Sequence, residues 1–386
     1  MNGRSVLPCS AIFVSIFLLS CDSSGPNDSP RAVLAVSGGD DHACLLVANG
    51  DAHCWGWGGQ GQLGPGDTLD YNIPTKVTGG ISFRQIAAGS AHTCGLTENG
   101  TAYCWGGNAV GALGDGNGVF RSKVPVAVNG GLRFRTISSG TGYTCGVTTN
   151  DLGYCWGSGL SGELGNGILE DEFEPVRVAG GLKFKDISTS LFHSCGVTTT
   201  GAAYCWGDNQ YGKLGIGNLA NSAVPVAVTG NHNFVSIGTG DFFTCGLTEQ
   251  GKVYCWGSNV SFELGNGAPG VSYTTEPVTL YGNPTFVSIA VGSYHACGFN
   301  SSGTLSCWGA NTYGKLGNGR ESATAVPVPV AGGHKFVSVT AGGNHTCGLT
   351  KSEEAFCWGW NRLGQLGIGS RTSQNEPSRV DQSYLP

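Results

Sequence analysis

The sequence predicts an all-β protein built from seven copies of one unit of about fifty residues. Glycine supplies 67 of the 386 residues and charged residues only 12%, a composition that disfavours the long amphipathic helices of a helical bundle. The hydrophobic content of 40% is enough for a packed core, and the glycines lack the period of collagen. Fourteen cysteines form seven pairs with a constant spacing of ten positions, and the pairs recur every 50 to 52 residues. Such self-similarity marks a solenoid or a propeller.

The first thirty residues are typical of a processing segment rather than of the repeats. Residues 1–20 contain Arg4 and an apolar run too short to span a bilayer, as in a signal peptide. The following Leu-Leu-Ser-Cys ends at Cys21 and resembles a bacterial lipobox, in which the signal is cut before a cysteine that then carries lipid. An ordinary secretory peptide with a chance cysteine is the alternative. Residues 21–30 are rich in Ser, Pro and Gly, and we expect a disordered tether.

Each unit contains four short segments with strand-like composition. In the second unit they are residues 83–86, 92–97, 103–106 and 125–128. The second and third segments carry the two cysteines and are separated by a short turn, so they form a hairpin.

The spacing of ten predicts that the two cysteines of a pair face each other across that hairpin. The three-residue turn 98–100 places Thr97 opposite Thr101, and counting back places Cys94 opposite Cys104. Directly opposed residues on antiparallel strands are close enough for a disulfide. We therefore predict seven disulfides, which join Cys44 to Cys54, Cys94 to Cys104, Cys145 to Cys155, Cys195 to Cys205, Cys245 to Cys255, Cys297 to Cys307 and Cys347 to Cys357.

A metal site is the competing interpretation of the cysteines. In five units a histidine lies two residues before the first cysteine, namely His42, His92, His193, His295 and His345. Structural zinc needs four ligands, each unit offers at most three, and Tyr143 and Phe243 replace the histidine in the other two units. Residues 59–64 match a dinucleotide-binding fingerprint in spacing but lack the helix and the later acidic residue. We predict no metal and no cofactor.

The unit reads His-Thr-Cys-Gly-Leu-Thr, then Tyr-Cys-Trp-Gly, then Gly-x-Leu-Gly-x-Gly and finally Pro-Val-x-Val. It resembles the repeat of the regulator of chromosome condensation family, seven times over residues 31 to 380. The resemblance implies a seven-bladed β-propeller over residues 31–386. Members of that family differ widely in function, so the resemblance implies the fold and not the activity. Guanine-nucleotide exchange is the least favoured function, because export would separate this chain from any cytosolic GTPase.

The connections between segments predict where one blade ends and the next begins. The short turn 129–131 joins the Pro-Val segment to the next Phe-x-x-Ile segment, whereas about twenty residues separate each Cys-Trp-Gly segment from the following Pro-Val segment. We therefore expect each blade to begin with the Pro-Val strand and the long connection to step between blades. Residues 377–380 are then left over, and we expect this C-terminal strand to close the ring by joining the first blade.

Function is expected at the end of the propeller that holds the long connections and the loops before each first cysteine. These residues vary between units while their surroundings do not, and several are aromatic. The long connections contain Trp57 and Trp360 just after their strands and Tyr211 and Tyr313 further along. We expect Trp57 and Trp360 to form one patch, and Phe192, Phe242, Phe243 and Tyr294 to form another over blades 4 to 6. Exposed aromatic residues on a rigid scaffold are enriched among binding hot spots, although plain packing is the alternative.

These observations predict a binding protein rather than an enzyme, because no nucleophile with a nearby base departs from the repeat pattern. We predict a monomer that is exported, anchored by lipid on Cys21 in a bacterial cell envelope, and bound through its loops to an envelope or extracellular protein. A carbohydrate-binding or enzymatic propeller that uses the same face or the central channel is the alternative. The net charge of −6 argues against nucleic acid as a partner. The acidic cluster 170–174 is expected to be a solvated loop, or else to meet a basic partner or a cation.

Overall fold

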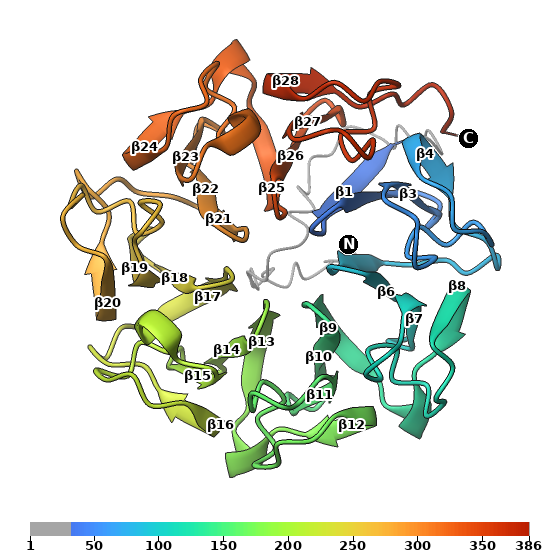
Figure 1. Ribbon diagram of the computed structural model, residues 1–386, viewed down its shortest axis with the longest axis horizontal. Coiled ribbons are helices and arrows are strands. Elements are labelled where there is room, and N and C mark those ends of the chain that lie inside the picture. The colour runs from blue at the N-terminus through green and yellow to red at the C-terminus, as the bar shows by residue number, and fades with distance from the viewer. Residues whose placement is uncertain (1–31, 386) are drawn as a thin grey trace, which may run out of the picture.

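A computed structural model describes residues 32–385, which form a ring of seven four-stranded antiparallel sheets (Figure 1). Each sheet is one blade, and its strands follow the order of the chain. In blade 1 these are β1 (Val33–Gly38), β2 (His42–Val47), β3 (Ala52–Gly56) and β4 (Tyr71–Lys76). The first strand of every blade lines the centre of the ring and the fourth lies at its outer edge (Figure 1). The expected seven-bladed β-propeller is confirmed.

The other blades repeat this plan. Their strands are β5 (Gln85–Ala88), β6 (His92–Leu96), β7 (Ala102–Gly107), β8 (Arg121–Ala127), β9 (Phe134–Ser139), β10 (Tyr143–Thr148), β11 (Gly153–Gly157), β12 (Glu172–Arg177), β13 (Phe184–Thr189), β14 (His193–Thr198), β15 (Ala203–Gly207), β16 (Ser222–Ala227), β17 (Phe234–Thr239), β18 (Phe243–Thr248), β19 (Val253–Ser258), β20 (Tyr273–Thr279), β21 (Ser288–Val291), β22 (His295–Phe299), β23 (Leu305–Gly309), β24 (Thr324–Pro329), β25 (Phe336–Ala341), β26 (His345–Thr350), β27 (Ala355–Gly359) and β28 (Gln374–Arg379). Five short 3-10 turns, η1 (Asn129–Gly131), η2 (Ala179–Gly181), η3 (Gln210–Gly212), η4 (Thr312–Gly314) and η5 (Ala331–Gly333), lie in the connections.

The expected blade boundaries were wrong by one strand. The Pro-Val strand β8 pairs with β7, so it is the fourth strand of its blade and the short turn η1 is the step to the next blade. The long connection lies inside the blade, where it folds into a compact loop. Its Leu113 is buried in one cluster with Trp156 of the next blade. The length of this connection therefore reflects packing between blades, not a step around the ring.

The expected ring closure was wrong for the same reason. The C-terminal strand β28 pairs with β27 of blade 7 and not with blade 1, so no strand crosses this junction. Side chains close it instead, together with backbone bonds between loops such as the one of 2.9 Å from Gly369 N to Asn72 O. Val380 and Leu385, which follow β28, are buried in one cluster with Val33 and Trp55 of blade 1. The indole Nε1 of Trp55 also donates a hydrogen bond of 2.9 Å to the carbonyl oxygen of Gln365.

The predicted hairpin register and disulfides are confirmed. Cys94 pairs with Cys104 in the β6–β7 ladder, and in all seven pairs the Cα atoms lie 4.0–4.1 Å apart and the sulfur atoms are bonded. The hairpin turns need one residue in the left-handed region. Gly100 supplies it with φ 80°, whereas Asp151 and Glu353 adopt it with φ 65° and 62° despite their side chains.

A tryptophan and a phenylalanine form the core of blades 2 to 7, and in blade 1 Val33 takes the place of the phenylalanine beside Trp55. Trp105 is fully buried, and its ring centroid lies 5.7 Å from that of Phe83. Gly95 faces Tyr103 in the ladder as expected, but Phe83 fills the space beside it: a Cβ on Gly95 would lie 2.5 Å from the Phe83 ring. The glycine is therefore required by the core phenylalanine.

Candidate functional site

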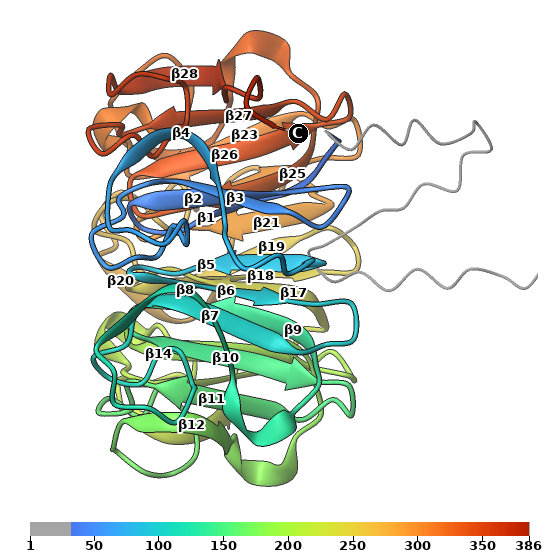
Figure 2. The same ribbon diagram turned by 90° about the vertical axis from the view of Figure 1, so that its right-hand side faces the viewer.

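The two ends of the ring differ in their connections (Figure 2). Because strands alternate in direction, the loops between the first and second strands share one end with the long loops between the third and fourth strands. Backbone bonds tie these two sets together, as from Trp57 N to Asp41 O at 2.9 Å and from Gly107 N to Ala91 O at 2.8 Å. We call this the loop end. The opposite turn end holds the hairpin turns and the short turns between blades, so the expected grouping of connections holds although the blade boundaries moved.

Aromatic rings from three blades meet at the loop end. Phe242 lies at their centre, with its ring centroid 5.9 Å from Tyr211 and 6.0 Å from Tyr294. Tyr273, which sequence reasoning missed, lies 6.4 Å from Tyr211. Phe192 and Tyr294 are 41% and 37% exposed. The structure thus brings together three of the four aromatic residues expected over blades 4 to 6, namely Phe192, Phe242 and Tyr294.

Two expectations about individual aromatic residues were wrong. Phe243 is fully buried, because it replaces the histidine that faces the next blade in other units. Trp360 lies 6.0 Å from Tyr313 of blade 6, and no ring contact with Trp57 occurs in residues 32–385. Trp57 packs on its own loop instead, since a Cβ on Gly59 would lie 2.6 Å from its Nε1. Both tryptophans are half-buried.

Two buried lysines lie under the exposed rings. The Nζ atom of Lys213 is 5.2 Å from the ring centroid of Phe242 and 6.0 Å from that of Phe192, and it forms an ion pair of 2.6 Å with Asp208. The Nζ atom of Lys315 is 5.6 Å from the Tyr294 ring. Cations under aromatic faces fix the orientation of the rings.

These lysines occupy a position of the repeat that is buried in all seven blades but differs in residue type from blade to blade. The residue before the leucine of Gly-x-Leu-Gly is buried in every blade, yet its type differs, as Gln62, Ala112, Glu163, Lys213, Glu263, Lys315 and Gln365. Comparison of the seven units could therefore have found it.

Several charged groups at the loop end are buried, and burial shifts their pKa values. Lys315 donates a hydrogen bond of 2.9 Å to the side-chain oxygen of Asn344, and burial lowers its pKa to about 8. Burial raises the pKa of Asp241 to about 6, and the nearby Asp40 adds to that shift. Burial also raises the pKa of Asp41 to about 6. The loop end therefore holds carboxylates that are poorly solvated.

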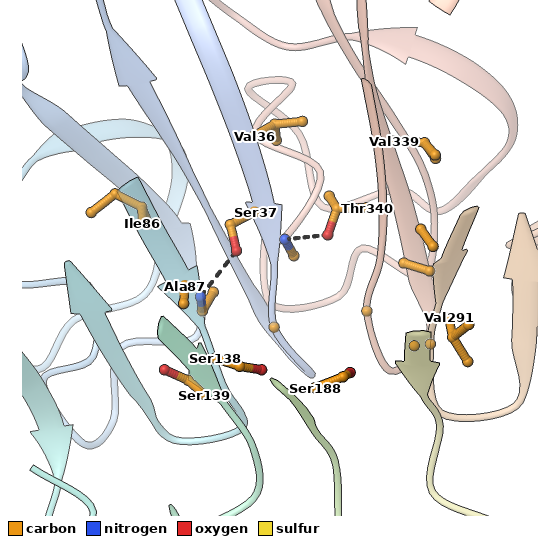
Figure 3. Close-up of a pocket in the computed structure, with 18 of the residues that line it drawn as sticks. Val36, Ser37, Ile86, Ala87, Ser138, Ser139, Ser188, Val291, Val339 and Thr340 are labelled. Atoms are coloured by element: carbon orange, nitrogen blue, oxygen red, sulfur yellow. Dashed lines mark hydrogen bonds between the residues drawn. The ribbon is translucent and has the colours of Figure 1, made fainter. Parts of the chain in front are cut away.

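A central channel of about 740 Å³ runs along the first strands (Figure 3). Its lining includes Asp40 and Asp241. Small side chains line its wall, and their hydroxyl groups join neighbouring blades. The Ser37 hydroxyl accepts a bond of 3.0 Å from Ala88 N, and the Thr340 hydroxyl accepts one of 3.0 Å from Gly38 N (Figure 3). These groups therefore serve the scaffold.

The repeated histidines also serve the scaffold. The Nε2 atom of His92 lies 2.8 Å from the Thr144 hydroxyl of the next blade, while the neighbouring cysteines are joined to each other. Within residues 32–385 no three potential metal-ligating side chains converge. Those residues likewise contain no helix with the length and apolar character to cross a membrane. The signal, the tether and Cys21 lie outside the described residues.

The residues of the acidic cluster 170–174 do not share one role, because some hold neighbouring segments and one is exposed. Asp171 accepts a hydrogen bond of 3.1 Å from Gly159 N, and Glu174 accepts one of 2.7 Å from the Asn129 side chain, so both hold neighbouring segments. Glu170 is exposed.

Comparison with known proteins adds the family. The model described as the RCC1-like domain matches residues 22–331, and models of the regulator of chromosome condensation (RCC1) repeat match residues 336–365 and 352–384. The ultraviolet-B receptor UVR8 of Arabidopsis thaliana is 31% identical over 148 residues, which are 37% of this chain and 33% of the receptor. The chain thus aligns with only a third of that relative.

Solved structures of two proteins show the same fold. Prp20p of Saccharomyces cerevisiae, described with its binding properties to Gsp1p and histones, is 21% identical with a TM-score of 0.77, over 92% of this chain and 88% of that one. The same yeast protein, RCC1 (Prp20), has been solved bound to Kap60. Human WBSCR16 is 22% identical with a TM-score of 0.75, over 83% of this chain and 87% of that one. Because the family model covers most of its length, this seven-bladed chain belongs to the RCC1-like domain family.

Proposed function

We propose that this chain is an exported, lipid-anchored protein of the cell envelope that binds another protein through its loop end. The observation that carries the proposal is the placement of exposed hydrophobic residues. Most of the large hydrophobic side chains that are exposed lie in loops of that end, namely Leu69, Val119, Phe120, Leu160, Ile168, Leu169, Phe192, Leu219, Val260, Val271, Tyr294 and Tyr313. Exposed apolar surface of this extent is typical of interaction sites.

The covalent chemistry of the chain supports export. Seven disulfides are typical of a protein that matures in an oxidising compartment. The position of the first described residues supports an orientation in which the turn end faces the membrane. Ala32 accepts a bond of 2.9 Å from Ala48 N in a hairpin turn, so the chain enters the ring at the turn end. A lipid on Cys21 would therefore leave the loop end facing away from the membrane.

The family supports a protein partner. Prp20p, a protein of the same fold, is described as binding Gsp1p and histones and has been solved with Kap60. We infer that the present chain also binds a protein and does so through its aromatic cluster, with Phe192, Phe242 and Tyr294 as the anchors and Tyr211, Tyr313, Trp57 and Trp360 around them. Rings held by buried lysines lose little conformational freedom on binding.

The test is capture from cell envelopes with paired variants. Replacing Phe192, Phe242 and Tyr294 by alanine should weaken binding of the captured protein at least tenfold with little change in melting temperature. Replacing Asn99 and Asn129 at the turn end is the matched control and should leave affinity unchanged. Equal losses from both ends, or binding of a glycan with no protein captured, would overturn the proposal; the second result would favour a carbohydrate-binding propeller.

The anchor is tested separately. Cys21→Ala should release the protein from membranes in a fractionation experiment, because it removes the only expected site for the acyl chains. Unchanged retention of the variant would refute the lipobox.

A further inference from the structure

The loop end is unevenly charged around the ring. In blades 1 to 3 its loops contain acidic residues and no basic residue: Asp40, Asp41, Asp67, Asp70, Asp115, Glu163, Glu170 and Asp171. The loops of blades 6 and 7 instead contain Lys315, Arg320, Arg362 and Arg371 with a single acid, Glu321. One side of the loop end therefore has more acidic than basic residues, although Glu163 is fully buried and the exposed Arg121, the first residue of β8, donates a hydrogen bond of 3.2 Å to the carbonyl oxygen of Gly59.

The same three blades expose aliphatic and aromatic side chains at the tips of their long loops. Leu69, Phe120 and Leu169 are 62%, 62% and 57% exposed, and Val119 and Ile168 lie beside them. We call these five residues the tip set. Acids adjoin them along the chain: Asp67 and Asp70 flank Leu69, and Glu170 follows Leu169 directly.

Loop geometry does not explain the tip set. All long loops pass a glycine with positive φ just before the tip, such as Gly66, Gly116, Gly319 and Gly369. After that glycine the loops of blades 6 and 7 read Arg-Glu-Ser-Ala and Ser-Arg-Thr-Ser, with no large apolar residue. The backbone therefore accepts polar residues at the tip, and the exposed apolar side chains of blades 1 to 3 meet no requirement of the fold.

The acids near the tip set keep their charge available. Asp67 and Asp171 accept hydrogen bonds from backbone amides, and in the described residues of these three loop sets only Asp70 has an ion pair, 3.9 Å from Arg371. A hydrogen bond from an amide satisfies one oxygen but does not neutralise the carboxylate. The negative field of these blades is therefore open to an external cation.

We propose that the loop tips of blades 1 to 3 dock a basic segment of a partner protein that also presents apolar side chains. This inference rests on the proposed function and specifies its partner. The tip set supplies apolar contact and the surrounding acids select positive charge, so an acidic protein, a nucleic acid and an anionic membrane are all disfavoured by repulsion. The aromatic cluster of blades 4 to 6 then contacts a different part of the same partner.

The experiment uses the mature protein and three twenty-residue probe peptides, followed by fluorescence anisotropy. One peptide is an amphipathic helix of lysine and leucine, the second has glutamate in place of lysine, and the third has the first composition scrambled. The lysine peptide should bind at least tenfold more tightly than the glutamate peptide and severalfold more tightly than the scrambled one. Its affinity should fall as salt rises from about 50 to 300 mM, because exposed charges are screened.

Variants locate the contact. Leu69→Ser with Phe120→Ser and Leu169→Ser should weaken lysine-peptide binding about tenfold. Asp67→Asn with Glu170→Gln and Asp171→Asn should weaken binding and reduce its salt dependence, while the amide oxygens still accept the loop hydrogen bonds. The matched control removes three charges at the turn end, through Glu98→Gln, Glu249→Gln and Glu353→Gln, and should change neither quantity.

Several outcomes overturn the proposal. These are equal binding of the glutamate peptide, equal loss in the turn-end control, and tip-dependent binding to phosphatidylglycerol vesicles, which would assign the surface to lipid. If the aromatic variant no longer captures an envelope partner but the tip variant still does, this inference is wrong and the proposed function stands. Tip-dependent peptide binding with no envelope protein captured would remove the proposed function.

Discussion

The Nε2 atom of His92 lies 2.8 Å from the hydroxyl of Thr144, across the junction between blades 2 and 3. The same contact joins His42 to Thr93, His193 to Thr244 and His295 to Thr346. Where the histidine changes, its partner changes with it. Tyr143 contacts Ser194 through its hydroxyl, and Phe243 shares a buried cluster with Ala296. Six of the seven junctions thus pair two residues of matching chemistry.

The first prediction exchanges one matched pair for another. Thr144→Ala alone leaves a buried imidazole nitrogen without its partner and should lower the free energy of unfolding by about 1–3 kcal/mol. Adding His92→Phe recreates the Phe243 and Ala296 pair and should recover most of that loss. Urea denaturation of the two single variants and the double variant measures the coupling. A double variant as unstable as the sum of the two single variants would contradict the matching.

The second prediction concerns the junction of blades 7 and 1, where the match fails. The position equivalent to Thr144 is Ala43, and neither ring nitrogen of His345 has a hydrogen-bond partner. Ala43→Thr should therefore stabilise the ring by about 0.5–1.5 kcal/mol, measured as a raised melting temperature. Ala296→Thr is the control, because Phe243 offers no ring nitrogen, and it should not stabilise. Stabilisation by both substitutions would show that the hydroxyl acts independently of His345.

The third prediction is a change in pH dependence. Burial lowers the pKa of His92 to about 4, from an ordinary value of 6.5. Between these values the unfolded chain binds a proton that the folded chain excludes, so this histidine costs stability as the pH falls from 6.5 to 4. Asp41 and Asp241, whose pKa burial raises to about 6, act in the opposite direction over a similar range.

Comparison of two proteins isolates the histidine. The variant with His92→Phe and Thr144→Ala keeps both aspartates, so their effect cancels. Its stability relative to the natural chain should rise as the pH falls, by up to about 1.4 kcal/mol for each pH unit between 6.5 and 4. Denaturation at pH 7, 6, 5 and 4 measures the slope. A stability difference that does not depend on pH would mean that His92 is protonated in the folded ring.

The fourth prediction concerns the hairpin disulfides. Each closes a loop of about eleven residues, and the chain-entropy model gives a stabilisation of roughly 2–3 kcal/mol for such a loop. Replacing Cys94 and Cys104 together by alanine should lower stability by that amount, and peptide mapping of the non-reduced natural chain should find all seven local pairs. Free thiols in the natural chain would contradict the pairing.

The sequence predicted those features that repeat. Seven copies of one spacing establish the number of blades, and a turn of known geometry between Thr97 and Thr101 establishes the register that brings Cys94 to Cys104. Local geometry decides each of these features, so the sequence between two neighbouring strands is sufficient.

The sequence did not predict features that depend on contacts between blades. Loop length alone suggested that the long connection steps between blades, because nothing local shows that Leu113 packs on Trp156. The same limit applies to the site. Aromatic residues over blades 4 to 6 could be grouped from equivalent loop positions, but the separation of Trp57 from Trp360 depends on how one ring packs on its own loop, and Lys213 was overlooked because it is buried.

The last prediction tests how the ring closes. If side chains rather than a strand hold blades 7 and 1 together, Leu385→Ala should destabilise the protein by about 2–4 kcal/mol, although every strand ladder stays intact. Leu385 is 3% exposed in the cluster that contains Val33 and Trp55, and it lies beyond the end of β28. Tyr384→Ala is the matched control, since that side chain is 62% exposed, and it should leave the melting temperature unchanged. Equal effects of the two substitutions would mean that the Leu385 side chain does not contribute to the closure, which would then depend on the hydrogen bonds across the junction, such as those from Trp55 to Gln365 and from Gly38 to Thr340.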